Sequence, residues 1–91
     1  MLREAMTCRI DRLSTEHGLV LYLSGRIAAN DLEVVRSALE GRGVVAIELA
    51  EVELVDRDTV TLLAQTEARG IELRSCPAYI REWITKERES S

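Results

Sequence analysis

The chain has 91 residues, the length of one small domain, and we expect a single domain with an ordered core over about residues 7–88. Twelve lysines and arginines against 16 aspartates and glutamates leave a net charge of −4, which disfavours nucleic acid as a partner. No apolar run approaches the ~20 residues that span a bilayer. The first residues include an acid and no apolar stretch, so we do not expect secretion. These features predict a cytoplasmic protein that does not insert into a membrane.

Cysteine and histidine usage argues against most catalytic and metal chemistry. Cys8 and Cys76 lie far apart in the sequence without a C-x-x-C motif, which favours two free thiols in a reducing compartment. His17 is the only histidine and precedes a glycine, a pattern typical of a turn. One imidazole cannot assemble a zinc site or a histidine-assisted nucleophile here. We therefore expect no metal, no cofactor and no enzymatic activity.

The chain is predicted to begin with a β-hairpin. Alternating polar and apolar residues indicate strands over 7–13 and 19–24, and the glycine-containing segment 14–18 indicates the turn between them. Residues 25–29 are interpreted as a connection to the first helix.

Asn30 is predicted to cap this first helix, with Glu33 three residues later as in a capping box. An amphipathic stripe indicates the side that packs inward, and it consists of Leu32, Val35, Ala38 and Leu39. Glycines at 41 and 43 mark the end of the helix.

The second half of the chain alternates strands with helices. Strands are predicted over 44–50 and 71–74. The helix between them follows Asp56 and ends at Gly70, and its inner stripe consists of Thr59, Leu62, Leu63 and Thr66. A last helix is predicted from Pro77 to about Arg88, with Ile80, Trp83 and Ile84 inward.

The element order β-β-α-β-α-β-α predicts a two-layer α/β sandwich. A hairpin followed by two right-handed crossovers gives a mixed sheet of four strands with helices mainly on one face. The other face is expected to be partly solvated or to contact a partner, and it carries Arg9, Asp11, Tyr22, Glu48, Glu72 and Arg74. The sequence leaves open a homodimer through this face or through the last helix.

The carboxyl ends of the parallel strands are the expected place for binding, as in other open α/β sheets. Two segments are predicted to lie there, 25–30 after the second strand and 51–59 after the third. Both precede a helix N-terminus, whose unpaired N–H groups and dipole favour negative charge. Arg26 and Arg57 within them are either contacts for an acidic partner or simply solvated.

Three segments resemble STAS domains, the family of the anti-sigma factor antagonists. AIELAEVELVD at 46–56 is similar to the strand and loop before the family's switch site, LYLSGRI at 21–27 to its second strand, and RGIEL at 69–73 to the entry of its fourth. The element order agrees, so the resemblance covers about residues 8–84. It implies a non-enzymatic regulatory module that binds a protein partner, a serine kinase that doubles as anti-sigma factor.

In that family the second serine of an Asp-Ser-Ser-Gly-like tetrapeptide is the phosphoacceptor. The matching residues here are Asp56, Arg57, Asp58 and Thr59, so the acceptor position holds a carboxylate that a serine kinase cannot phosphorylate. Asp58 either keeps the module in a phosphorylated-like state or belongs to the epitope of a different partner. Alternatively, Asp56 and Asp58 only cap and charge the helix start. Thr59 and Thr61 are the alternative acceptors, and Thr59 is disfavoured because it lies on the inner stripe.

The partner-binding surface implied by the resemblance consists of Gly25, Arg26, Asn30, Asp56, Arg57, Asp58 and Thr59. A second interpretation keeps the fold, because STAS-like domains also serve as cytoplasmic subunits of membrane transporters or of other signalling complexes without a phosphoserine switch. Away from this surface, Cys76 near a helix start is a candidate for a lowered thiol pKa or a small core residue. Tyr79 is a candidate for the rim of an interface.

Overall fold

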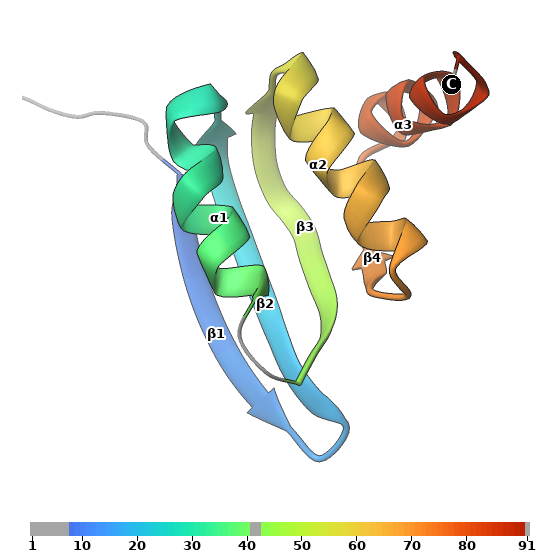
Figure 1. The fold of residues 1–91 in the computed structure, drawn as a ribbon. Helices are drawn as coiled ribbons and strands as arrows, with labels where there is room; N and C mark the ends of the chain where they lie inside the picture. The colour runs from blue at the N-terminus through green and yellow to red at the C-terminus, as the bar shows by residue number, and fades with distance from the viewer. Residues whose placement is uncertain (1–7, 41–42, 91) are drawn as a thin grey trace, which may run out of the picture.

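The computed structural model describes residues 8–40 and 43–90 and contains a four-stranded mixed sheet in the order β1-β2-β3-β4. Strand β1 is antiparallel to β2, whereas β2, β3 and β4 are parallel. Helices α1 and α2 cover one face of the sheet, and α3 lies beside α2 (Figure 1). The α/β architecture predicted from the sequence is thereby confirmed. In chain order the elements are β1 (Arg9–Thr15), β2 (Gly18–Ile27), the 3₁₀ turn η1 (Ala29–Asp31), α1 (Leu32–Leu39), β3 (Val44–Val55), α2 (Arg57–Ala68), β4 (Glu72–Arg74) and α3 (Ala78–Ser90).

The hairpin between β1 and β2 closes on a two-residue turn at Glu16 and His17. The Thr15 hydroxyl donates to the Gly18 carbonyl (2.7 Å) and accepts from the His17 N–H (3.2 Å). Gly18 has a φ of 138°, and a Cβ there would lie 2.5 Å from the Gly43 carbonyl oxygen. Only glycine therefore fits at the start of β2. Strand β1 lies two residues later than predicted, and Thr7 is outside the described residues.

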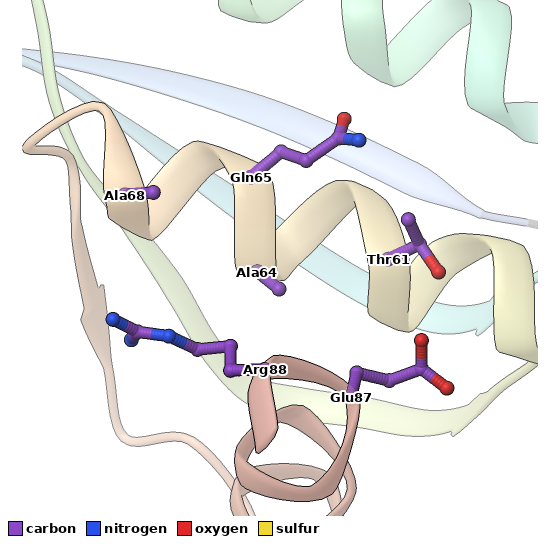
Figure 2. A pocket seen from close by; sticks show the side chains of 6 residues that line it. All are labelled: Thr61, Ala64, Gln65, Ala68, Glu87 and Arg88. Atoms are coloured by element: carbon purple, nitrogen blue, oxygen red, sulfur yellow. The ribbon is translucent and has the colours of Figure 1, made fainter. Parts of the chain in front are cut away.

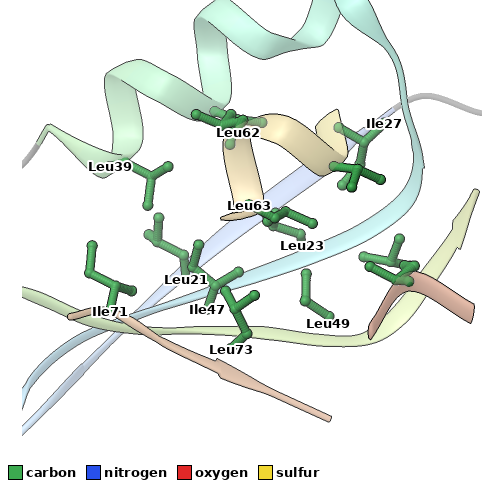
Figure 3. Close-up of a cluster of buried hydrophobic side chains, with 14 of the residues drawn as sticks. Leu21, Leu23, Ile27, Leu39, Ile47, Leu49, Leu62, Leu63, Ile71 and Leu73 are labelled. Carbon is green, nitrogen blue, oxygen red and sulfur yellow. The ribbon is translucent and has the colours of Figure 1, made fainter. Parts of the chain in front are cut away.

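The core lies between the sheet and the helices, as Figure 3 shows. Side chains from alternate positions of β2 and β3 meet the inner stripes of α1 and α2, and the stripe residues predicted for those helices are buried, apart from the half-buried Leu32. Helix α2 also buries Val60 and Ala64, which the predicted stripe omitted. From α3, Ile80 and Ile84 are fully buried, whereas Trp83 is half-buried and packs against the cluster.

The sheet face away from this core carries most of the polar and charged side chains, together with the buried Val20 and Ala46. The register sets Asp11, Tyr22, Glu48 and Arg74 side by side across the four strands. Neighbouring charges pair on it, Arg9 with Asp11 at 3.2 Å on β1 and Glu72 with Arg74 at 2.9 Å on β4. The residues predicted for this face are therefore confirmed on it.

Strands β2 and β3 are longer than the sequence predicted. Residues 25–27, interpreted as a connection, extend β2, and residues 51–55 extend β3. The parallel ladder between them shifts register at three points, each time with one extra residue on β3. At the middle shift the Ala50 N–H donates a hydrogen bond to the Glu48 carboxylate (3.3 Å). These bulges interrupt the two-residue period of β3, which is why its alternation pattern ended early.

The start of α1 also differs from the prediction. Asn30 does not cap the helix, because it lies inside η1. The residue that bonds back is Asp31, whose carboxylate accepts from the Ala28 N–H at 3.0 Å. The predicted end at Gly41 lies outside the described residues. Gly70, by contrast, ends α2 as predicted, with a φ of 98°, and α3 begins one residue after Pro77.

Candidate functional site

The two predicted segments meet at one edge of the sheet, where β2 and β3 end side by side. Ile27 pairs with Val55, directly before the start of α2. The Thr59 hydroxyl lies 3.1 Å from the Ile27 carbonyl oxygen and links α2 to the end of β2. We call the surface formed by Gly25–Asn30 and Asp56–Thr59 the C-terminal edge.

Asp56 caps α2 from an extended conformation. One carboxylate oxygen accepts from both the N–H (3.0 Å) and the hydroxyl (2.8 Å) of Thr59. Burial by itself raises the pKa of Asp56, but hydrogen bonds from Thr59 and from the Ala29 backbone favour the carboxylate, and the net pKa is lowered. Asp56 is therefore occupied with holding the helix start.

Asp58 has a different environment, although it lies only two residues further. It is exposed in the first turn of α2, where the helix dipole favours its negative charge. Its neighbour Arg57 reaches across to Glu87 of α3, with 3.5 Å between Nε and Oε2. Asp58 thus presents an outward negative charge at the C-terminal edge, while Arg57 leans toward α3.

The two threonines considered as acceptors differ in access. Thr59 is 1% exposed, and its hydroxyl lies between the Asp56 carboxylate and the Ile27 carbonyl. Thr61 is half-buried and donates to the Arg57 carbonyl at 3.1 Å. Thr59 therefore belongs to the interior side of the edge, as its place on the predicted stripe indicated.

The other predicted residues of the edge lie at its surface. Gly25 is half-buried with a φ of 85°, a backbone conformation suited to glycine. Arg26 and Asn30 are exposed. Arg26 pairs with Leu54 of β3, so both belong to the polar face of the sheet where it reaches the edge.

Two exposed apolar residues beside the edge widen the candidate surface. Leu54 is 50% exposed at the end of β3, and Tyr79 is 44% exposed at the start of α3. The Tyr79 hydroxyl donates to the Glu53 carbonyl at 2.7 Å, which places α3 against the end of β3. The sequence had marked Tyr79 as an interface rim, whereas nothing in it distinguished Leu54.

An open groove of about 390 Å³ lies between α2 and α3. Thr61, Ala64, Gln65 and Ala68 of α2 form one wall, and Glu87 and Arg88 of α3 face them (Figure 2). Arg88 also contributes an ion pair to Glu67 at 3.3 Å. Sequence analysis did not foresee this groove, because it depends on how α3 packs.

Neither cysteine has an activated thiol. Burial raises the pKa of Cys8 and of Cys76, and in Cys76 nearby Arg81 offsets this only in part. The lowered pKa considered for Cys76 is therefore wrong. Over residues 8–40 and 43–90 the structure contains no group of three or more side chains suited to a metal ion. None of the helices in the described part of the chain has the length and apolar character to cross a membrane.

Comparison with protein-family models finds no match for this chain, and comparison with curated proteins finds none either.

Proposed function

We propose that this protein is a non-enzymatic regulatory module that docks on a protein partner through the C-terminal edge. The observation that carries the proposal is the linkage of Thr59 to the Ile27 carbonyl, which brings the segments Gly25–Asn30 and Asp56–Thr59 into one surface. Asp58, Arg26 and Asn30 are exposed on it. A surface of charged and amide side chains around a helix start suits recognition of another protein's polar groups.

The partner we propose is a switch-type serine kinase that doubles as anti-sigma factor, as the STAS resemblance implies. Asp58 supplies one negative charge where phosphoserine would supply about −1.5 to −2. In this proposal the module acts in the cytoplasm and carries a fixed charge where STAS domains with a phosphoserine switch carry the acceptor serine.

The test is an affinity capture from the native cytoplasm with wild type, Asp58→Ser and Glu16→Ser side by side. Glu16 is an exposed acid in the hairpin turn, at the opposite end of the sheet. Glu16→Ser therefore removes the same charge as Asp58→Ser, but away from the C-terminal edge. We expect wild type and the Glu16 variant to capture the same kinase, and the Asp58 variant to capture a clearly different amount. Phosphate on the introduced serine would add that a kinase still recognises this position.

Capture of the kinase to the same extent by all three proteins would contradict a role for Asp58 in docking. Capture of no specific partner by wild type would contradict the proposal as a whole.

A second candidate is a cytoplasmic subunit of a membrane transporter or of another signalling complex without a phosphoserine switch. One observation favours it: Asp58 occupies the acceptor position, and the adjacent Thr59 hydroxyl is buried and bonded. In the same capture experiment this function predicts transporter or membrane-associated subunits in place of a kinase.

A further inference from the structure

Arg57 connects the proposed docking surface to α3. It is the first residue of α2 and belongs to the C-terminal edge. Its Nε lies 3.5 Å from Oε2 of Glu87 on α3. In Figure 2 Glu87 lies beside Thr61, toward the start of α2, whereas Arg88 extends toward Ala68. The edge therefore carries a cation that an acidic side chain of the same molecule already contacts.

The contact between Arg57 and Glu87 is looser than the ion pairs of Glu67 with α3. Arg81 and Arg88 lie 2.9 and 3.3 Å from Glu67 and donate hydrogen bonds to it. The Arg57 side chain is 78% exposed, and ion pairs of such exposed groups contribute little to stability. A guanidinium has five N–H donors, so those of Arg57 that do not face Glu87 are open to another acceptor. Arg57 can therefore exchange one carboxylate for another with little effect on the fold.

Glu87 is held more firmly than Arg57. Its side chain is 24% exposed and lines the groove between α2 and α3. The mobile member of the pair is therefore Arg57, whose guanidinium can turn away from α3 while Glu87 stays in place. Successive residues of a helix lie about 100° apart around its axis, so Arg57 and Asp58 project in different directions from the helix start. A second carboxylate on Arg57 is thus kept apart from that of Asp58.

We infer that Glu87 occupies the place of an acidic side chain of the docking partner. In the free protein Glu87 binds the Arg57 guanidinium, and on docking a carboxylate of the partner replaces it. Helix α3 therefore competes with the partner for Arg57 and weakens docking. This inference rests on the proposed function, and it adds the chemistry of one partner contact and an internal contact that opposes it.

The test measures the dissociation constant of the kinase captured by wild type, by calorimetric titration with single and double variants. Glu87→Gln frees Arg57, so we expect the dissociation constant to fall about two- to fivefold. Arg57→Gln removes the cation and should raise the dissociation constant. The double variant Arg57→Gln/Glu87→Gln should bind like Arg57→Gln alone, because Glu87 acts through Arg57. Glu82→Gln is the control, since it removes the same charge at an exposed position of α3 and should leave binding unchanged.

The fluorescence of Trp83, the only tryptophan, shows whether α3 keeps its place in each variant. If Glu87→Gln displaces α3, Arg57→Gln decides the question, and an unchanged dissociation constant for that variant would overturn the inference.

Other results would overturn the inference while leaving the proposed function standing. They are an unchanged dissociation constant for Glu87→Gln, an equal fall for Glu82→Gln, and an effect of Glu87→Gln that persists in the double variant. A wild type that captures no kinase would overturn the proposed function and this inference together.

Discussion

At the scale of single residues, Asp56 and Asp58 show how two carboxylates in one helix turn acquire different roles. Asp56 accepts two hydrogen bonds from Thr59 and holds the helix start. The Thr59 hydroxyl has one proton, which the Asp56 carboxylate and the Ile27 carbonyl both compete for. Asp58 is exposed and points its charge outward from the same turn. Burial and bonding therefore assign Asp56 to the stability of the helix start and leave the Asp58 carboxylate exposed, as the proposed docking role requires.

Replacing Asp56 should lower stability in a pH-dependent manner. We expect Asp56→Ala to reduce the free energy of unfolding by about 1 kcal/mol at neutral pH, because the helix loses its cap. The folded-state pKa lies below the ordinary value of 3.8. The contribution of the charge is therefore present above that value and is lost as the pH falls through the folded-state pKa. Urea unfolding from neutral to acid pH should show the gap to wild type closing in acid.

Asp56→Asn is the matched variant, since an amide oxygen still accepts from the Thr59 N–H but carries no charge. It should keep the cap but lack the contribution of the charge, so its stability at neutral pH should lie between those of wild type and Asp56→Ala. A wild type and an Ala variant separated by a constant gap down to strong acid would show that the charge of Asp56 does not contribute.

At the scale of elements, the position of α3 depends on side-chain contacts with α2 and with the core. Its 13 residues form a helix that would be marginal in isolation. Ile80 and Ile84 of α3 are fully buried in the core. Arg81 of α3 forms an ion pair with Glu67 of α2, with 2.9 Å between Nη1 and Oε1. Arg57 adds a longer contact to Glu87. Packing and a small ion-pair network together thus hold α3 against α2.

Removing the charge of Glu67 should loosen α3 and change its pH response. The hydrogen bond from Arg81 lowers the pKa of Glu67 below 4.5, against the effect of burial. Its contribution is present above 4.5 and is lost as the pH falls through the folded-state pKa. Trp83 on α3 is the only tryptophan, so its fluorescence reports the environment of this helix. We expect an acid transition of that fluorescence in wild type and a weakened one in Glu67→Gln.

Glu72→Gln on β4 is the control, because it removes an exposed carboxylate whose ion-pair partner is Arg74 of the same strand. An acid transition of equal size in the Glu67 and Glu72 variants would argue against Glu67 as the group that couples α3 to pH.

At the scale of the whole molecule, the helices cover one face of the sheet and leave the other polar. Adjacent residues of β2 belong to the two different environments. Leu21 is fully buried under the helices, whereas Tyr22 is 38% exposed among charged neighbours on the other face. The stability of the fold therefore derives mainly from one side of the sheet.

The pair Leu21→Ala and Tyr22→Ser tests this division at neighbouring positions. We expect Leu21→Ala to lower the free energy of unfolding by about 2–5 kcal/mol, through lost burial and a residual cavity. Tyr22→Ser should cost less than about 1 kcal/mol. Urea midpoints of the two variants measure the difference, and similar losses at both positions would mean that the polar face is also covered.

Some features of this fold could be predicted because the signal is local. Strict alternation identified the two faces of β1 and β4, and a glycine with positive φ ended α2 where Gly70 stands. The longer β3 could not be predicted, because its bulges opposite β2 break its two-residue period. In β2 the alternation continues to Ile27, and Gly25 is the residue that suggested a connection there. The prediction of Asn30 as the helix cap was wrong, because Asn30 lies inside η1 and the neighbouring Asp31 carboxylate accepts from the Ala28 N–H.

The candidate site divides in the same way. The edge itself could be predicted, since the ends of parallel strands and the following helix starts share one side of an α/β sheet. The contacts of Arg57 with Glu87 and of Tyr79 with Glu53 could not, because each joins α3 to an element far away in sequence.

The sequence by itself determined the element order, the buried face of most elements and the residue types at the C-terminal edge, because periodicity and capping are properties of neighbouring residues. The inner stripe already marked Thr59 as buried, but the tertiary structure alone decided which groups these residues bond. The Thr59 hydroxyl contacts the carbonyl of Ile27, which lies 32 positions earlier in the sequence. The packing of α2 on the sheet brings these two groups together. Packing between distant segments therefore separates Asp58, which faces solvent, from Asp56 and Thr59, which hold the fold together.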